Sequence, residues 1–253
     1  MVRKIFRILY QETETLHQAA LLLGSFAILS QALAFLRDRL LAHIFGASAA
    51  LDIYYAAFRV PDIIFVTVAS VVSLSVLIPF IIEREAKSVE ALRAFVNNIF
   101  SFFSILIITV SGLAFLLLPA ISQFLFAGFS DAAMAEVVFI SRILLLSPIL
   151  LGFSNLFGSL TQAYNRFILY ALAPLLYNAG IIAGIVLLAL RWGVLGVAIG
   201  VVAGASLHAL VQVPFIVKGA GQRERVDVRA PMRGETLLKR VIEESCRSHR
   251  SAA

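Results

Sequence analysis

Six long apolar runs dominate this sequence and limit what the chain can fold into. Each approaches or exceeds the roughly 20 residues that an α-helix needs to cross a hydrocarbon core of about 30 Å. The runs are continuous, whereas a transmembrane β-barrel needs short segments of alternating hydrophobicity. The first helix is expected to continue toward Phe45. The sequence thus predicts an all-α, polytopic membrane bundle of about six transmembrane helices, near residues 16–35, 60–82, 95–118, 137–160, 167–190 and 193–217.

Composition supports a membrane protein, and the absence of catalytic motifs from the sequence argues against an enzyme. Hydrophobic residues make up 60% of the chain and charged residues 14%, and the mean hydropathy is +0.94. A soluble domain carries about 25% charged residues, so this chain cannot bury its apolar surface in one aqueous core. The single cysteine, Cys246, excludes an internal disulfide, and the four histidines lack metal-ligand spacing. Because the sequence has no acid–base pair, phosphate loop or nucleophile motif, we expect no catalytic residue, metal or cofactor.

The chain divides into three segments. Residues 1–15 interleave basic and apolar side chains, which suits a basic amphipathic segment lying on a membrane surface. Residues 16–217 hold the six-helix lobe, and residues 218–253 form a polar, basic tail. The net charge is +6, and nine of the 21 Lys and Arg residues lie from Lys218 onward. Because basic segments beside membrane spans usually face anionic lipid in the cytoplasm, we expect membrane lipid as a partner and no nucleic acid.

The distribution of Lys and Arg predicts the orientation of the chain. An even number of spans, with the N-terminus, residues 83–93 and the tail in the cytoplasm, follows the usual excess of positive charge on that side. Five arginines then fall on the outer side, which is more than passive anchoring explains: Arg37, Arg39, Arg59, Arg142 and Arg191.

Charged residues interrupt the apolar pattern between residues 35 and 64. Arg37 and Asp38 lie where the first helix is expected to continue, and three more charges follow closely: Asp52, Arg59 and Asp62. Two interpretations remain open. The charges mark the end of a span at the headgroups, or they pair in a polar cavity, as charges between apolar helix segments normally do. A cavity wall of mixed sign suits an anionic or sugar-bearing substrate.

Small and polar residues within the spans predict helix packing. Two sets of glycines are spaced by four residues, so each set shares a helix face where backbones can approach closely: Gly180 and Gly184, then Gly196, Gly200 and Gly204. Prolines in spans form kinks or ends, and a minority act as hinges in transporters. We assign packing or hinge roles also to Gly46, Pro61 and Pro174. Amide side chains are expected to form interhelical hydrogen bonds more often than substrate contacts: Asn155, Gln162, Asn165, Asn178 and Gln212.

Three motifs, in order along the chain, resemble one family of transporters. Residues 37–62 carry Arg-Asp, then Ile-Phe-Gly-Ala, a later Asp, and Arg-Val-Pro-Asp. Residues 160–182 carry Ala-x-x-Arg-Phe, Ala-Pro and Asn, and residues 193–215 are similar to the sixth span of that family. Together they cover roughly residues 25–217 and resemble the MurJ/MviN family of lipid II flippases, within the superfamily of multidrug, oligosaccharidyl-lipid and polysaccharide exporters.

The resemblance implies a fold and a function. Family members have two six-helix lobes that give alternating access to a cationic cavity. They carry an undecaprenyl-pyrophosphate-linked peptidoglycan precursor, lipid II, from the cytoplasmic to the periplasmic leaflet of the bacterial inner membrane. Arg37, Asp38 and Asp52 match positions that line or gate this cavity, and Arg59 matches the family's basic residue before proline.

Two features depart from the family. The chain has one lobe, so we expect either a truncated or frameshifted product, or a half-size transporter that pairs with a second lobe or forms a homodimer. The family also has arginines where this chain has Gln31, Phe65 and Val66. Fewer cationic contacts leave two alternatives: an exporter of another polyprenyl-linked glycan or amphipathic solute, or a non-transporting membrane protein.

Overall fold

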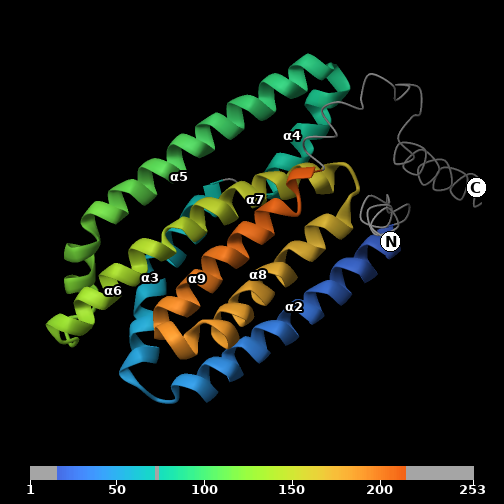
Figure 1. The fold of residues 1–253 in the computed structure, drawn as a ribbon. Coiled ribbons are helices and arrows are strands. Elements are labelled where there is room, and N and C mark those ends of the chain that lie inside the picture. The colour runs from blue at the N-terminus through green and yellow to red at the C-terminus, as the bar shows by residue number, and fades with distance from the viewer. Residues whose placement is uncertain (1–15, 72–73, 215–253) are drawn as a thin grey trace, which may run out of the picture. The chain divides into compact units, whose positions relative to one another are not determined.

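The computed structural model describes residues 16–71 and 74–214. These residues fold into helices, with no strand among them, so the predicted all-α fold is confirmed (Figure 1). The predicted N-terminal segment and the predicted tail lie outside the described residues. The helices are α2 (Leu16–Phe45), α3 (Ala49–Val71), α4 (Leu74–Lys87), α5 (Val89–Leu125), α6 (Asp131–Leu144), α7 (Leu146–Ala163), α8 (Phe167–Leu187) and α9 (Ala189–Leu210).

Five of the predicted spans coincide with described helical segments that are long and apolar enough to cross a membrane. Their ranges are His17–Phe45, Val89–Leu125, Asp131–Ala163, Phe167–Leu187 and Ala189–Leu210. As expected, α2 continues unbroken to Phe45 past its charged residues. The remaining predicted span, 60–82, covers the end of α3 and most of α4. It includes residues 72–73, which lie outside the described part of the chain, so this span stays a prediction.

The charged connection predicted between the second and third spans is almost entirely helical. α4 continues to Lys87 and α5 begins at Val89, so only Ser88 separates them. The Ser88 hydroxyl accepts a hydrogen bond from the Ala91 N–H at 3.1 Å and caps α5. Glu83 and Lys87 lie four residues apart on α4 and form an ion pair at 2.7 Å. The charged residues therefore extend two helices beyond their apolar parts instead of forming a loop.

The fourth predicted span is interrupted at Leu145, between α6 and α7. Pro148 explains the interruption, because it has no N–H to donate to the carbonyl of Leu144 four residues earlier. The Ser147 hydroxyl donates to that carbonyl at 2.7 Å instead. The missing backbone hydrogen bond is thus replaced inside the bundle, and α6 and α7 together still form one apolar span.

α8 and α9 pack backbone against backbone, because glycines face one another across their interface. A methyl group added to Gly180 would lie 2.4 Å from the Cα of Gly204, and one added to Gly184 would lie 2.5 Å from the Cα of Gly200. Gly196 fits equally closely, at 2.6 Å, against the backbone between the two helices. Any side chain at these positions forces the helices apart, which is why small residues occupy them.

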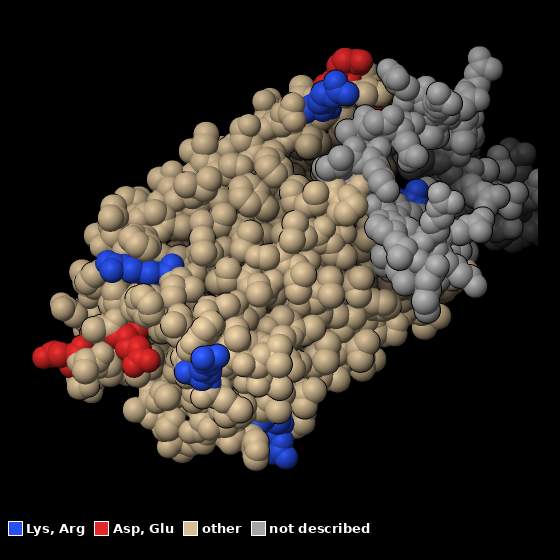
Figure 2. Space-filling view, in the orientation of Figure 1, with Lys and Arg blue, Asp and Glu red and all other residues tan. Residues whose placement is uncertain are grey.

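Two buried apolar clusters hold the bundle together. The first joins α2, α3, α6, α8 and α9, and includes Leu41, Ile53, Ala57, Ile140, Ile181, Ile185, Val197 and Val201. The second joins α3, α4, α5 and α7, and includes Val60, Ile64, Ile81, Phe103, Ile107 and Leu156. α2 and α5 lie on opposite sides of the bundle, with α7, α8 and α9 between them (Figure 1). Most of the molecular face seen in Figure 2 carries neither acidic nor basic side chains, as expected of helices in contact with hydrocarbon.

Candidate functional site

Arg37 and Asp38 form an ion pair on α2. The Arg37 Nε donates to Asp38 Oδ1 at 2.9 Å, and Nη2 of the same guanidinium lies 2.9 Å from that oxygen. α2 ends only at Phe45. There Gly46 takes the left-handed conformation, with φ of 61°, and its N–H donates to the Ala42 carbonyl at 3.0 Å. The charged pair therefore lies within the helix, two turns before its end.

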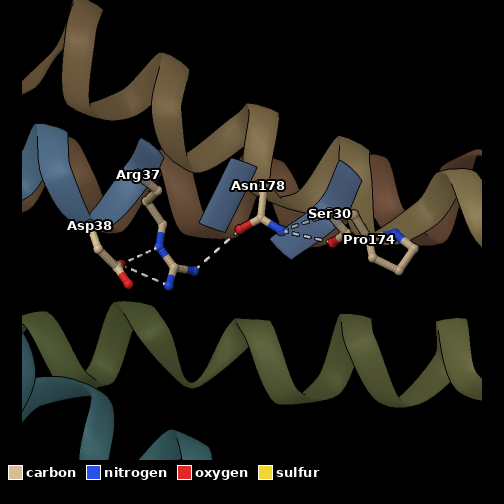
Figure 3. Close-up of polar contacts among 5 residues, drawn as sticks. All are labelled: Ser30, Arg37, Asp38, Pro174 and Asn178. Atoms are coloured by element: carbon tan, nitrogen blue, oxygen red, sulfur yellow. Dashed lines mark hydrogen bonds and ion pairs between the residues drawn. The ribbon is translucent and has the colours of Figure 1, made fainter. Parts of the chain in front are cut away.

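Asn178 on α8 connects this ion pair to the neighbouring helix (Figure 3). Its Oδ1 accepts a hydrogen bond from Arg37 Nη1 at 3.3 Å. Its Nδ2 donates to the Ser30 hydroxyl of α2 at 3.3 Å and to the Pro174 carbonyl at 3.1 Å. These two acceptors fix the orientation of the amide, so that its oxygen faces the guanidinium. The sequence predicts an interhelical hydrogen bond for Asn178, and the structure contains one.

α3 brings further polar side chains to the same region. The positive charges of Arg59 and Arg37 both act on the Asp62 carboxylate. Arg37 also interacts electrostatically with the hydroxyls of Tyr54 on α3 and Tyr177 on α8. Arg37 is thus the common partner of groups from three helices.

The predicted site residues are only partly brought together. Arg37, Asp38 and Arg59 share this region, although Arg59 is exposed and forms no ion pair within 4 Å among the described residues. Asp52 lies exposed in the first turn of α3, and within 16–71 and 74–214 its side chain makes no hydrogen bond or ion pair. Arg37, Asp38 and Asn178 are linked by hydrogen bonds and form what we call the Arg37 cluster. Asp52 therefore stands apart from the Arg37 cluster, although it is close to Arg37 in sequence.

The two prolines predicted as packing or hinge positions lie in continuous helices. Pro61 leaves the Ala57 carbonyl without its backbone partner, and the buried Ser141 hydroxyl of α6 donates to that carbonyl at 3.0 Å. Pro174 offers its own carbonyl to Asn178. Neither α3 nor α8 is broken at its proline. Pro61 thus frees a carbonyl that a polar side chain of another helix occupies, whereas the contact at Pro174 is to the carbonyl of the proline itself.

The arrangement leaves Arg37 able to bind an anion. A guanidinium has five N–H donors, and Nε, Nη1 and Nη2 each use one on Asp38 or Asn178. One N–H remains on each terminal nitrogen, and two such donors can bind two oxygens of a phosphate. The Arg37 side chain is 24% exposed, so these donors are accessible. The described residues contain no cluster of three or more His, Cys, Asp or Glu side chains that would hold a metal ion.

Sequence reasoning assigned no role to Ser30, Tyr54 or Tyr177. The tyrosines lie in apolar helices and resemble ordinary core residues, and both are indeed largely buried. One signal was available, because Tyr177 directly precedes Asn178 within an apolar helix. A polar pair in such a helix usually has partners on another helix.

Comparison with known proteins decides the family. A model described as lipid II flippase MurJ matches residues 41–244. The chain belongs to the MurJ family. It is 28% identical over 213 residues to the lipid II flippase MurJ of Burkholderia cenocepacia, a match that covers 80% of this chain and 40% of that protein. It is 30% identical over 201 residues to the probable lipid II flippase MurJ of Thermotoga maritima, covering 76% of this chain and 39% of that protein.

A solved MurJ structure shares the fold. It is titled lipid II flippase MurJ, inward closed conformation, and it matches with a TM-score of 0.67 and 23% identity over 78% of this chain and 42% of that chain. The chain thus spans about two fifths of the length of the MurJ relatives it matches. MurJ proteins form a transporter family and not a family of catalysts. With its five long apolar helices, the chain is a multi-pass membrane protein of this bacterial family.

Proposed function

We propose that this chain forms one lobe of a lipid II flippase. In this proposal the lobe carries an undecaprenyl-pyrophosphate-linked peptidoglycan precursor from the cytoplasmic to the periplasmic leaflet by alternating access. Membership of the MurJ family and the shared fold support it. The observation that carries the proposal is the Arg37 guanidinium, held by two helices with two N–H donors left over for an anion.

Arg37 is the pyrophosphate contact in this proposal. A fixed guanidinium binds two phosphate oxygens at once, which a mobile point charge does not. Asp38 and Asn178 act as positioning residues, because they hold the guanidinium from two sides. Arg59 and Asp62 extend the polar wall along α3.

A second lobe completes the cavity. Because the chain spans about two fifths of its relatives, the opposite wall comes from a further polypeptide segment or from a second copy of this chain. The exposed Asp52 at the start of α3 is free to contact that second lobe, which suits a gating role. The N-terminus, residues 83–93 and the tail are cytoplasmic in this proposal, following the positive-inside rule.

A second candidate is the export of another polyprenyl-linked glycan. The observation that favours it is the set of family arginines replaced by Gln31, Phe65 and Val66. The exposed Gln31 and Val66 add no positive charge to the lobe. A substrate with a smaller anionic headgroup would need fewer cationic contacts.

The test is a lipid II accessibility assay in cells depleted of their own flippase. The chain is expressed alone, and also together with the C-terminal half of a MurJ relative. We expect externally accessible lipid II to be restored when both parts are present. If neither combination restores accessibility, although both proteins are found in the membrane, the lipid II assignment is wrong. Restored export of a different lipid-linked glycan would favour the second candidate.

A further inference from the structure

A lateral groove lies between α5 and the junction of α6 with α7. Its volume is about 610 Å³. Its lining residues lie on α5, α6 and α7 and at Leu145, and α5 is on the opposite side of the bundle from α2, which carries Arg37 (Figure 1). Its walls are mainly apolar, with one charged residue among the lining side chains: Ile108, Ser111, Gly112, Phe115, Phe139, Arg142, Ile143, Leu145, Leu146 and Ile149.

Arg142 reaches this groove without an acidic partner. Its Cζ lies 4.8 Å from the centroid of the Phe115 ring, so an aromatic face is its neighbour. Its Nε is buried and has no hydrogen-bond acceptor, and no carboxylate within the described ranges lies at ion-pair distance. The Ser111 hydroxyl lines the same groove, is 3% exposed as a residue and also lacks a partner. Two donors of different helices therefore line one apolar groove, and the described part of the chain supplies no acceptor for either the Arg142 Nε or the Ser111 hydroxyl.

The order of polar and apolar groups along the groove matches an amphiphile. Arg142 lies five residues inside the predicted fourth span, about 8 Å along the helix at 1.5 Å per residue. Side chains on a helix lean toward its N-terminus, and arginine extends its head to the interface. With the span limits predicted from the sequence, we expect the guanidinium to reach the level of lipid headgroups. From there the groove continues toward Ile108 and Ile149, deeper in the hydrocarbon.

We propose that this groove binds one anionic phospholipid, with its phosphate on Arg142 and an acyl chain along the apolar wall. The phosphate supplies the acceptors that the guanidinium lacks. Ser111, one helical turn deeper on α5 than Phe115, lies where an ester carbonyl can accept its proton. The site is separate from the transported substrate, because it lies away from the Arg37 cluster, and it stands or falls independently of the flippase assignment.

The test measures lipid contact at the groove by fluorescence quenching. Trp192 is the one tryptophan of the chain, so Trp192→Phe combined with Phe139→Trp places a single reporter on the exposed groove wall. The protein is reconstituted in vesicles that contain brominated phosphatidylglycerol or brominated phosphatidylcholine. We expect a binding preference for phosphatidylglycerol of about fivefold, which corresponds to about 1 kcal/mol for one basic residue near anionic lipid.

Three variants of this reporter protein make the result decisive. Arg142→Gln is expected to abolish the preference, whereas Arg39→Gln, which removes an arginine beside Phe35 on α2, is expected to keep it. Gly112→Leu fills the groove, since a Cβ there meets no atom within 4 Å, and is expected to reduce quenching by both lipids.

Several outcomes would overturn the proposal. Equal quenching by the two lipids in the parent protein, or a preference that survives Arg142→Gln, would remove the assigned role of Arg142. Unchanged quenching in Gly112→Leu would show that lipid does not enter the groove. A preference abolished by soluble glycerol phosphate would identify a site for a free anion. Quenching that falls as the protein-to-lipid ratio rises would identify a second copy of this chain as the occupant.

Discussion

Replacement of Asn178 by leucine is expected to weaken the lobe and its substrate contact together. The variant loses a bond to the charged Arg37 and two bonds to neutral acceptors, Ser30 and the Pro174 carbonyl. A hydrogen bond to a charged group contributes about 1.5–3 kcal/mol, and interhelical hydrogen bonds in membranes average about 0.6 kcal/mol. Because the Arg37 bond is long and partly exposed, we take the lower end of its range. With the two neutral bonds added, we expect a total loss of about 3 kcal/mol.

The assay for Asn178→Leu combines stability with transport. Asn155→Leu is the matched control, because Asn155 is a half-buried amide on α7 that makes no hydrogen bond to the described residues. The free energy of unfolding is measured in micelles, and flipping is measured in vesicles with the complete two-lobe assembly. Since Arg37 keeps its charge but loses its orientation, we expect the apparent KM for the substrate to rise about tenfold. Equal stability of the two variants, with unchanged flipping, would refute the positioning role of Asn178.

Three further predictions concern packing, titration and topology. Gly180→Ala is expected to destabilise by at least about 1–3 kcal/mol, because its new methyl group meets the α9 backbone; an unchanged unfolding curve would contradict the packing. The Lys87 ammonium lowers the pKa of the Glu83 carboxyl. This pair therefore stabilises the protein above the ordinary Glu pKa of about 4.3, and the effect is lost as pH falls through the lower folded pKa. Carbon NMR should show the Glu83 pKa rising in Lys87→Met, and no rise would exclude the pair. In a Cys-free background, an outside-only reagent should label Ala127→Cys and spare Ala86→Cys; the reverse pattern would invert the topology.

The sequence predicts the helical membrane fold well because long apolar runs have few alternatives in a bilayer. It also predicts that α2 passes through Arg37, since nothing in the local sequence terminates a helix before Gly46. The sequence predicts that most prolines in spans form kinks or ends, but it does not say which of them do so. The helix is interrupted at Leu145, near Pro148, whereas α3 and α8 continue past Pro61 and Pro174. Which of these occurs depends on a nearby acceptor or donor, here the Ser147 hydroxyl.

The candidate site is predicted less completely than the fold. Charges close together in sequence suggest one cluster, yet Asp52 stands apart from it while the distant Asn178 is a direct partner of Arg37. Such contacts depend on how α2 and α8 pack, and a single sequence does not give the packing of helices. Ser141 shows the same limit, because its acceptor is the Ala57 carbonyl of another helix.

Substrate flipping by Arg37 variants tests the central claim most directly. Flipping of lipid II is measured in the complete two-lobe assembly and normalised to the amount of protein in the membrane. Loss of a charge-assisted hydrogen bond to pyrophosphate costs about 1.5–3 kcal/mol, so Arg37→Gln should reduce flipping about ten- to a hundredfold at low substrate. Arg37→Lys should keep only part of the activity, and Arg39→Gln should remain near wild type. Wild-type flipping by Arg37→Gln at normal abundance would contradict the account and return Arg37 to a structural role.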